Sequence, residues 1–215
     1  MNRRRRLQRK KSFIRRQRSL RNMFKTALVA IALLLSFSAS AEKAVFAGGC
    51  FWCMEADFEK VEGVESVISG FTGGSLENPT YNGNHQGHYE AVEVTYDPTK
   101  VTYEDLLAHY WINIDPFDAE GQFCDKGHSY LSAIFVKDDT QKALAENSRE
   151  TVIKRFPEQI VVTPILSLGT FYPIKGEESY HQDYYKNNPL KYRYYRWGCG
   201  RDQRLDSIWG DSRKH

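Results

Sequence analysis

The sequence lacks the features of a membrane-spanning or disulfide-stapled protein. Its main apolar run, Ala27–Leu35, is about half of the ~20 residues that a helix needs to cross a bilayer. Four of the 215 residues are cysteine, which is few for a chain long enough to build a hydrophobic core without covalent cross-links. Internal repeats and Pro/Gly/Ser-rich linkers are also absent, so we interpret residues 42–215 as a single domain.

Acidic residues are missing from residues 1–41, which carry 12 Lys and Arg. Residues 42–215 hold 18 basic and 27 acidic side chains, a net charge of −9 for the body of the chain. Nucleic-acid binding needs clustered cations, so this acidic body argues against a nucleic-acid partner. The basic leader alone would suit RNA or a membrane surface, but it continues into a more specific signal.

That signal begins near Met23. Lys25 is followed by the apolar run and then by Ala39-Ser40-Ala41, which together are typical of a secretory signal peptide. We predict a signal peptide over about residues 23–41, cleavage after Ala41, and a periplasmic or secreted protein without a membrane span. Residues 1–22 are then an over-long basic segment or lie before the true start of translation.

Hydrophobic periodicity predicts an alternation of strands and helices in the body. The first six elements have the order β-α-β-β-α-β, which is typical of the ferredoxin-like split βαβ plait, an α+β fold. A helix, a strand and a long C-terminal tail are appended to it. The predicted strands are Lys43–Ala47, Val64–Phe71, Ala91–Tyr96, Tyr130–Val136 and Ile160–Leu166. The predicted helices run from Phe51 to Gly63, from a cap at Thr102, over Asp139–Arg155, over Glu177–Lys186 and near Gln203–Trp209.

The most informative segment joins the first strand to the first helix. Two glycines precede Cys50, which stands at the first turn of the helix. Unpaired N–H groups and the helix dipole stabilise negative charge there, so we expect a lowered thiol pKa and a nucleophilic thiolate. An isolated cysteine more often fills space, but the preceding glycine pair favours the nucleophile. Cys50 and Cys53 also form a CxxC motif.

Beyond this segment, several groups of residues follow one another in the order of a known family. With Gly-Cys-Phe-Trp and Glu55, they resemble the methionine sulfoxide reductase A family over about residues 43–185. The groups are Gly70-Phe71-Thr72-Gly73-Gly74, Asn78-Pro79-Thr80-Tyr81, Gly87-His88-Tyr89-Glu90 with Tyr96-Asp97-Pro98, Gln122 with Asp125, Gly127 and Tyr130, and Gly169 to Tyr172 with Tyr180-His181-Gln182. The resemblance implies a ferredoxin-like α/β roll that reduces the S epimer of methionine sulfoxide, in proteins and as the free amino acid.

The resemblance also implies roles for individual residues. Cys50 attacks the sulfoxide, Phe51 and Trp52 hold its methyl group, and Glu90 donates the proton that the departing oxygen needs. A carboxyl beside aromatic rings has a raised pKa and stays protonated, as a general acid must. Without the resemblance, we would interpret Glu90 as a solvated charge at the end of a strand.

Three further residues complete the implied site. Tyr81 and Tyr130 hydrogen-bond the sulfoxide oxygen, and Asp125 supports the site through hydrogen bonds. In a chain with 13 tyrosines, the two tyrosines would otherwise be ordinary strand and loop aromatics. The stretch between Tyr81 and Glu90 is shorter than in the common form of the family, which bears on the alignment of Tyr81.

Attack leaves a sulfenic acid on Cys50, which a second thiol converts into a disulfide. Cys199, between two glycines in the tail, is the preferred resolving cysteine, because relatives resolve with C-terminal cysteines. Cys53 and Cys124 are the alternatives. An external dithiol must then reduce the disulfide, so the resemblance implies a thioredoxin-like partner and no bound cofactor.

Two other classes of protein compete with this interpretation. A thiol–disulfide oxidoreductase would use Cys50 and Cys53 as its redox pair and would lose activity on substitution of Cys53. A zinc protein would need more ligands at short spacing, and the sequence has neither a second CxxC nor an HxxxH motif. We therefore expect no metal site.

Overall fold

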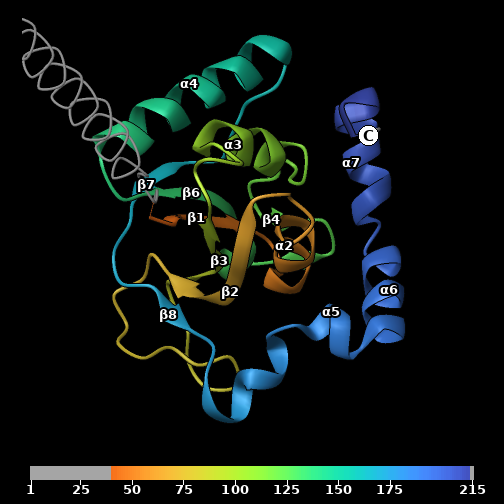
Figure 1. The fold of residues 1–215 in the computed structure, drawn as a ribbon. Helices are drawn as coiled ribbons and strands as arrows, with labels where there is room; N and C mark the ends of the chain where they lie inside the picture. Colours follow the sequence, from red (N-terminus) through yellow and green to blue (C-terminus); the bar gives the residue numbers. More distant parts are fainter. Residues whose placement is uncertain (1–39, 214–215) are drawn as a thin grey trace, which may run out of the picture. The chain divides into compact units, whose positions relative to one another are not determined.

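Six strands form one sheet at the centre of the protein, whose computed structural model describes residues 40–213 (Figure 1). The order is β7-β6-β1-β3-β2-β8, and neighbouring strands are antiparallel except for β6 and β7. The middle strands, β6-β1-β3-β2, have the order of the ferredoxin-like plait, which confirms the predicted α+β fold. The strands are β1 (Glu42–Gly48), β2 (Val64–Thr72), β3 (Tyr89–Tyr96), β6 (Ser132–Val136), β7 (Ile165–Ser167) and β8 (Tyr172–Pro173).

Three helices cover one face of this sheet. They are α2 (Phe51–Phe58), α3 (Tyr103–Trp111) and α4 (Asp139–Arg155). α3 begins as predicted, because the side chains of Thr102 and Asp105 each accept the other residue's backbone N–H in a capping box. Side chains of β1 alternate between the two faces, so Phe46 packs under the helices and Val45 packs under loops on the other side.

Parts of the prediction from Tyr130 onward are wrong. The predicted strand Ile160–Leu166 is reduced to β7, because Pro164 has no N–H to donate and Val162 instead bonds the carbonyl oxygen of Pro116. Tyr130 lies in a 3-10 turn, His128–Tyr130, rather than in a strand.

The predicted helix Glu177–Lys186 is broken into a 3-10 segment, Gly176–His181, and the short helix α5 (Tyr184–Asn187). The buried carboxylate of Glu55 causes the break. It accepts hydrogen bonds from the side-chain amide of Gln182 at 2.7 Å and from the backbone N–H of Asp183 at 2.6 Å. These hydrogen bonds to α2 replace hydrogen bonds within a continuous helix. They also tie the C-terminal tail to α2, the helix that carries Cys53 and follows Cys50.

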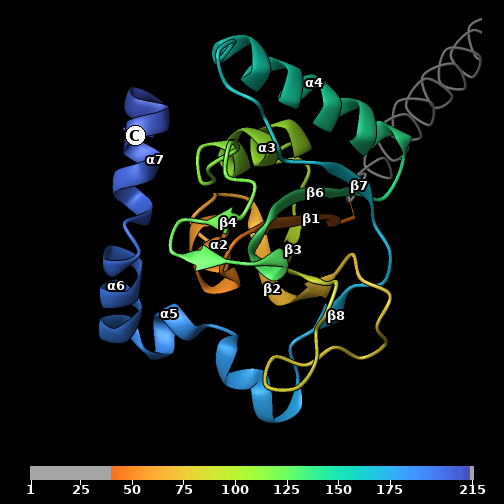
Figure 2. The same cartoon turned by 180° about the vertical axis from the view of Figure 1, so that it is seen from behind.

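The C-terminal tail contains more helix than the sequence predicted. Helices α6 (Pro189–Gly198) and α7 (Arg201–Trp209) run along one side of the molecule beside α2 (Figures 1 and 2). Gly200, with a φ of 66°, separates them. A small hairpin of β4 (Gly121–Gln122) and β5 (Asp125–Lys126) lies on the same side.

The predicted leader and signal peptide lie outside the described residues, apart from Ser40 and Ala41. Within residues 40–213, no helix has both the length and the apolar character required to span a membrane.

Candidate active site

The redox motif lies on a sharp turn between β1 and α2. Gly49 has a φ of 82°, which residues with a Cβ rarely adopt. At Gly48 a Cβ would lie 2.5 Å from the Sδ atom of Met54, so the backbone passes too close to α2 for a larger residue. Cys50 is the N-cap of α2, and its carbonyl oxygen accepts the backbone N–H groups of Cys53 and Met54. The two glycines thus place Cys50 at the start of the helix.

We expect Gly49→Ala to destabilise the protein by at least about 1–2 kcal/mol, the usual cost of a left-handed conformation for a residue with a Cβ. A clash adds to this cost, because the new Cβ would lie 2.6 Å from the Cβ of Gln122. Urea unfolding followed by circular dichroism measures the change. Gly169→Ala is the matched control, since no atom lies within 4 Å of a Cβ built there. Equal stability of the two variants would contradict the expectation.

The two thiols of the motif are buried and interact with each other. Cys50 and Cys53 are free and are 6% and 2% exposed. Burial, followed by the neighbouring Cys53, raises the pKa of the Cys50 thiol well above its ordinary value. A hydrogen bond from Cys50 lowers the pKa of Cys53 to about 7, and the positive charges of Arg201 and Arg196 act in the same direction. The expected low pKa at Cys50 is therefore wrong for this structure, because the nearby donor and cations favour the thiolate of Cys53.

The two arginines were missed by the sequence analysis. Arg201, at the start of α7, is buried and donates to the carbonyl oxygens of Gly48 and Asn113 at 3.3 and 2.7 Å. Arg196, in α6, forms a 2.9 Å ion pair with the buried Asp57 of α2. Sequence spacing carries no sign of either contact, since α2 and the tail are far apart in the chain. The closeness of Arg201 to Cys199 in sequence was the available hint.

Glu90, in β3, directs its carboxyl group at the start of α2. Its Oε2 accepts the backbone N–H of Phe51, one of the helix N–H groups without a partner inside the helix, at 3.1 Å. Burial raises the pKa of Glu90 to about 8, and the charges of Asp125 and Cys53 act in the same direction, while the Phe51 N–H opposes them. The carboxyl group is therefore protonated at neutral pH. A solvated charge at a strand end, the alternative interpretation, is wrong.

Aromatic rings form a wall on this side of α2. Phe51 stacks on Tyr81, and Tyr81 lies against His181, with ring centroids 6.0 and 3.9 Å apart. Trp52 stacks on Tyr184 at 3.8 Å, and its indole N–H donates to Nδ1 of His181 at 3.0 Å. The tail thus contributes His181 and Tyr184 to the wall.

Two tyrosine hydroxyl groups lie within the electrostatic influence of Cys50 and Glu90. Burial, followed by the charges of Glu90 and Cys50, raises the pKa of Tyr81 to about 12. Burial also raises the pKa of Tyr130, and Glu90 is the next largest cause. Both hydroxyls keep their protons at neutral pH and remain hydrogen-bond donors. Glu90 comes from β3, Tyr81 from the loop between β2 and β3, and Tyr130 from the 3-10 turn before β6.

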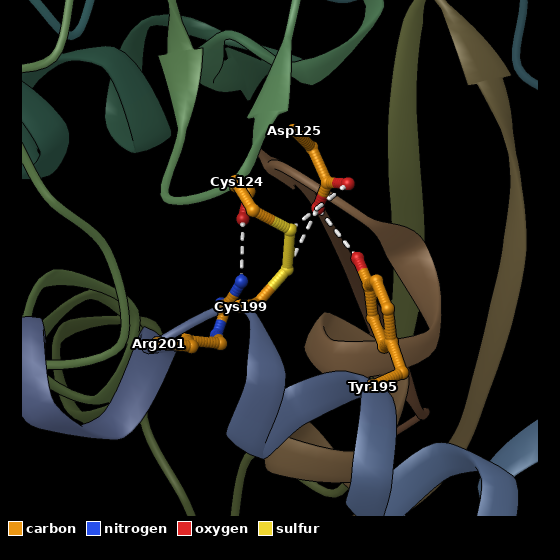
Figure 3. Close-up of a disulfide and its surroundings, with 6 residues drawn as sticks. Cys124, Asp125, Tyr195, Cys199 and Arg201 are labelled. Atoms are coloured by element: carbon orange, nitrogen blue, oxygen red, sulfur yellow. Dashed lines mark hydrogen bonds between the residues drawn. A yellow bond between two sulfur atoms is a disulfide. The ribbon is translucent and has the colours of Figure 1, made fainter.

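A disulfide between Cys124 and Cys199 joins the β4–β5 hairpin to the end of α6 (Figure 3). Asp125 lies beside it, with Oδ1 3.6 Å from the Sγ atom of Cys124, and accepts a 2.5 Å hydrogen bond from the hydroxyl of Tyr195. The same hydroxyl interacts with the thiol of Cys50. The sequence analysis weighed each cysteine only as a partner of Cys50 and did not predict this pairing.

The same bond bears on the zinc hypothesis. Cys124, Asp125 and Cys199 form the cysteine-containing group among residues 40–213 whose ligand atoms lie within 4.8 Å of one another. Its two sulfurs are bonded to each other in this structure. They do not offer the thiolates that zinc requires.

These features together define the class of protein. A buried thiol pair lies beside a protonated carboxyl group and two hydroxyl donors, and a second cysteine pair lies nearby. Such a site can attack an oxidised sulfur, protonate the oxygen that leaves, and return to the thiol form through a disulfide. The fold and the site therefore define a thiol-dependent oxidoreductase.

Comparison with known proteins gives the family. The family model described as peptide methionine sulfoxide reductase matches residues 42–213. A peptide methionine sulfoxide reductase MsrA 2 of Caulobacter vibrioides is 54% identical over 79% of this chain and 86% of its own length. An MsrA of Halalkalibacterium halodurans is 49% identical over 79% and 97%. The solved methionine sulfoxide reductase A of Corynebacterium diphtheriae has a TM-score of 0.63 and 33% identity, covering 73% of this chain and 79% of that one. The chain belongs to the peptide methionine sulfoxide reductase family, which confirms the resemblance noted in the sequence.

Proposed function

We propose that this peptide methionine sulfoxide reductase acts on the S epimer of methionine sulfoxide, in proteins and as the free amino acid, with Cys50 as its nucleophile. The main support for these roles is one contact. The buried, protonated Glu90 accepts the N–H of Phe51, the first residue of the helix that Cys50 caps. The carboxyl group of Glu90 on β3 and the thiol of Cys50 therefore lie at the same end of α2.

In the first step, the Cys50 thiol passes its proton to the adjacent Cys53 thiolate, and the sulfur of Cys50 attacks the sulfur of the sulfoxide. Glu90 supplies the proton to the oxygen, and the hydroxyls of Tyr81 and Tyr130 donate hydrogen bonds to that oxygen as negative charge develops on it. The apolar faces of Phe51 and Trp52 take the methyl group. The products are methionine and a sulfenic acid on Cys50.

In the second step, Cys53 resolves the sulfenic acid. Its pKa of about 7 makes a thiolate available at neutral pH, and its hydrogen bond from Cys50 shows that the two side chains are adjacent. The thiolate attacks the sulfur of Cys50 and releases the hydroxyl group, which takes a proton to leave as water. The product is a Cys50–Cys53 disulfide. Cys199, the preferred resolving residue on sequence grounds, is bonded to Cys124 in this structure.

A dithiol protein of the thioredoxin type completes the cycle, because the two electrons spent on each sulfoxide must come from outside the chain. The predicted signal peptide, with its basic leader, supports a periplasmic or secreted location for this cycle. Asp125, through its bond to Tyr195, holds the tail next to Cys50 in this scheme.

The order of the disulfides is tested with the reduced protein and one equivalent of the S epimer of blocked methionine sulfoxide, without reductant. We expect Cys199→Ser to form a Cys50–Cys53 disulfide, and Cys53→Ser to accumulate a sulfenic acid that dimedone traps. Mass spectrometry of quenched digests identifies both. A Cys50–Cys199 disulfide that forms equally fast in Cys53→Ser and in the unchanged protein would instead assign resolution to Cys199.

The same experiment separates the alternative function. A thiol–disulfide oxidoreductase would yield no methionine from either epimer, although its CxxC pair would still exchange with disulfide substrates. Methionine from the R epimer at the rate of the S epimer would contradict the proposed stereochemistry.

A further inference from the structure

Arg201, the first residue of α7, places a buried guanidinium group beside the redox motif. The residue is 2% exposed, and its guanidinium bonds residues on both sides of the motif. Nη1 donates to the carbonyl oxygen of Gly48 at 3.3 Å, and Nη2 donates to the Sδ atom of Met54 at 3.3 Å. A Cβ built on Gly49 would lie 3.7 Å from Nη1. The cation therefore lies against both ends of the short segment that carries the thiol pair.

This buried cation lacks a full counter-ion among residues 40–213. Its hydrogen bonds go to carbonyl oxygens and to a thioether, which carry no net charge. Its ion pair with Asp57 is long, with Oδ2 4.0 Å from Nε, and Nε has no hydrogen-bond partner in the described part of the chain. Burying an uncompensated charge costs free energy, and a buried donor without a partner calls for an explanation. A negative charge that forms close to Arg201 is therefore stabilised.

Asp57 is already shared by two other cations. Arg196 donates to its two carboxylate oxygens at 3.0 and 2.9 Å, and Lys60 bonds its Oδ1 at 3.1 Å. Arg196 also bonds the carboxylate of Asp202, at 2.9 and 2.8 Å. The two arginines of the tail therefore differ, because two carboxylates neutralise Arg196 at hydrogen-bond distance and none does so for Arg201.

The thiol of Cys53 is the group that supplies the missing negative charge. It lies in the first turn of α2, between Gly48 and Met54 in the chain, and is buried. A hydrogen bond from Cys50 is the largest cause of its lowered pKa of about 7, and Arg201 makes the largest contribution of any charge. The Cys53 thiolate and the guanidinium are thus two buried charges of opposite sign that stabilise each other.

Other ionisable groups also face Cys53, from each element packed against it. They are Cys50 and Asp57 at α2, Glu90 of β3, Tyr192, Tyr195 and Arg196 of α6, and Arg201 of α7. Burial raises the pKa of Cys50, Glu90 and the two tyrosines, so these four groups are uncharged at neutral pH. Asp57 and Arg196 are paired with each other. Arg201 is therefore the unbalanced charge that faces the thiolate.

We propose that Arg201 is a positioning residue of this reductase, and that its guanidinium group is the counter-ion of the Cys53 thiolate. The proposal rests on the proposed function, in which this thiolate accepts the proton of Cys50 and Cys53 later resolves the sulfenic acid. Arg201 exchanges neither electrons nor protons in these steps. When the Cys50–Cys53 disulfide forms, both sulfurs become uncharged, and the cation loses its partner until the pair is reduced again.

The pH profile of Cys53 alkylation tests this role. The reduced protein, without sulfoxide, is pulsed with iodoacetamide over a range of pH, and mass spectrometry of digests gives the rate at Cys53. We expect a midpoint near pH 7 in the unchanged protein. In Arg201→Gln the midpoint should rise by at least about one unit, the usual effect of losing a close opposite charge. Arg201→Lys keeps the charge and should restore most of the lower midpoint. Arg193→Gln is the matched control, because Arg193 is exposed on α6, and it should leave the midpoint unchanged.

A second measurement needs no substitution at Arg201. The NMR signal of its Nε–H group should shift as the pH of the reduced protein passes through about 7, and should stay constant in Cys53→Ser. An unshifted midpoint in Arg201→Gln, or an Nε–H signal that does not respond to pH in the unchanged protein, would overturn the proposal. Equal shifts in Arg201→Gln and Arg201→Lys would also overturn it, because the effect would not depend on the charge. Both measurements omit the sulfoxide, so failure of the reduced protein to release methionine would instead overturn the proposed function.

Discussion

Cys50→Ser is expected to abolish methionine formation, with a loss of at least about 1,000-fold, because loss of a covalent nucleophile has effects of this order or larger. A serine hydroxyl at this position is not ionised at neutral pH and attacks sulfur poorly. Single-turnover assays with the S epimer of blocked methionine sulfoxide measure the loss. The reduced protein should release one equivalent of methionine, and the variant none.

Cys53→Ser, Cys124→Ser and Cys199→Ser are the matched controls for this prediction. Each removes one thiol of the same size, but none removes the residue at the N-terminus of α2. Each should still release methionine once, even where recycling fails. Release of methionine by Cys50→Ser together with loss of release in one of the others would move the nucleophile to that cysteine.

Glu90→Gln should lower the single-turnover rate by about 10²–10⁴-fold, the usual contribution of a positioned general acid. The amide keeps the size of the side chain but has no proton to transfer. In the unchanged protein, burial raises the pKa of Glu90 to about 8, so the rate should fall as the pH rises through 8. This alkaline limb should be missing from the pH profile of the variant. An alkaline limb that persists in the variant would assign it to another group.

The same pKa shift has a consequence for stability. The folded-state pKa lies above the ordinary value of 4.5, so the folded protein binds the proton more tightly than the unfolded chain does. The stabilisation from the protonated carboxyl group is present below pH 4.5 and is lost as the pH rises to about 8. Glu90→Gln does not ionise and should therefore be more stable than the unchanged protein at pH 9. Urea midpoints at pH 5 and pH 9 measure this difference and show that the inactive variant is folded.

Local sequence signals predicted the part of the site that lies on consecutive elements. The glycine pair, Cys50 and the aromatic residues follow a strand and open a helix, and each of these positions follows from backbone geometry over a few residues. The order of the first six elements was readable for the same reason, since hydrophobic periodicity reports which face of each element is buried. The burial of Glu90 in the site could be predicted only from the family resemblance, because its local sequence suggests a solvated charge at the end of a strand.

The tail could not be predicted in this way, because its contacts join residues that are far apart in the chain. Arg201 bonds Gly48 across 153 residues of chain, and Tyr195 bonds Asp125 across 70. The break in the predicted helix Glu177–Lys186 has a similar origin, since Glu55 outcompetes the helix for the N–H of Asp183. Helix propensity favours a continuous helix over these residues, but hydrogen bonds to the buried carboxylate of Glu55 favour the broken form.

The Cys124–Cys199 bond closes a loop of 75 residues that contains β6, α4 and the tail helix α6. In the chain-entropy model, closing a loop of this length lowers the conformational entropy of the unfolded chain. This stabilises the folded protein by about 4 kcal/mol. The protein with this bond reduced is therefore easier to unfold than the protein with the bond closed. Its resistance to unfolding thus depends on the redox state of its surroundings.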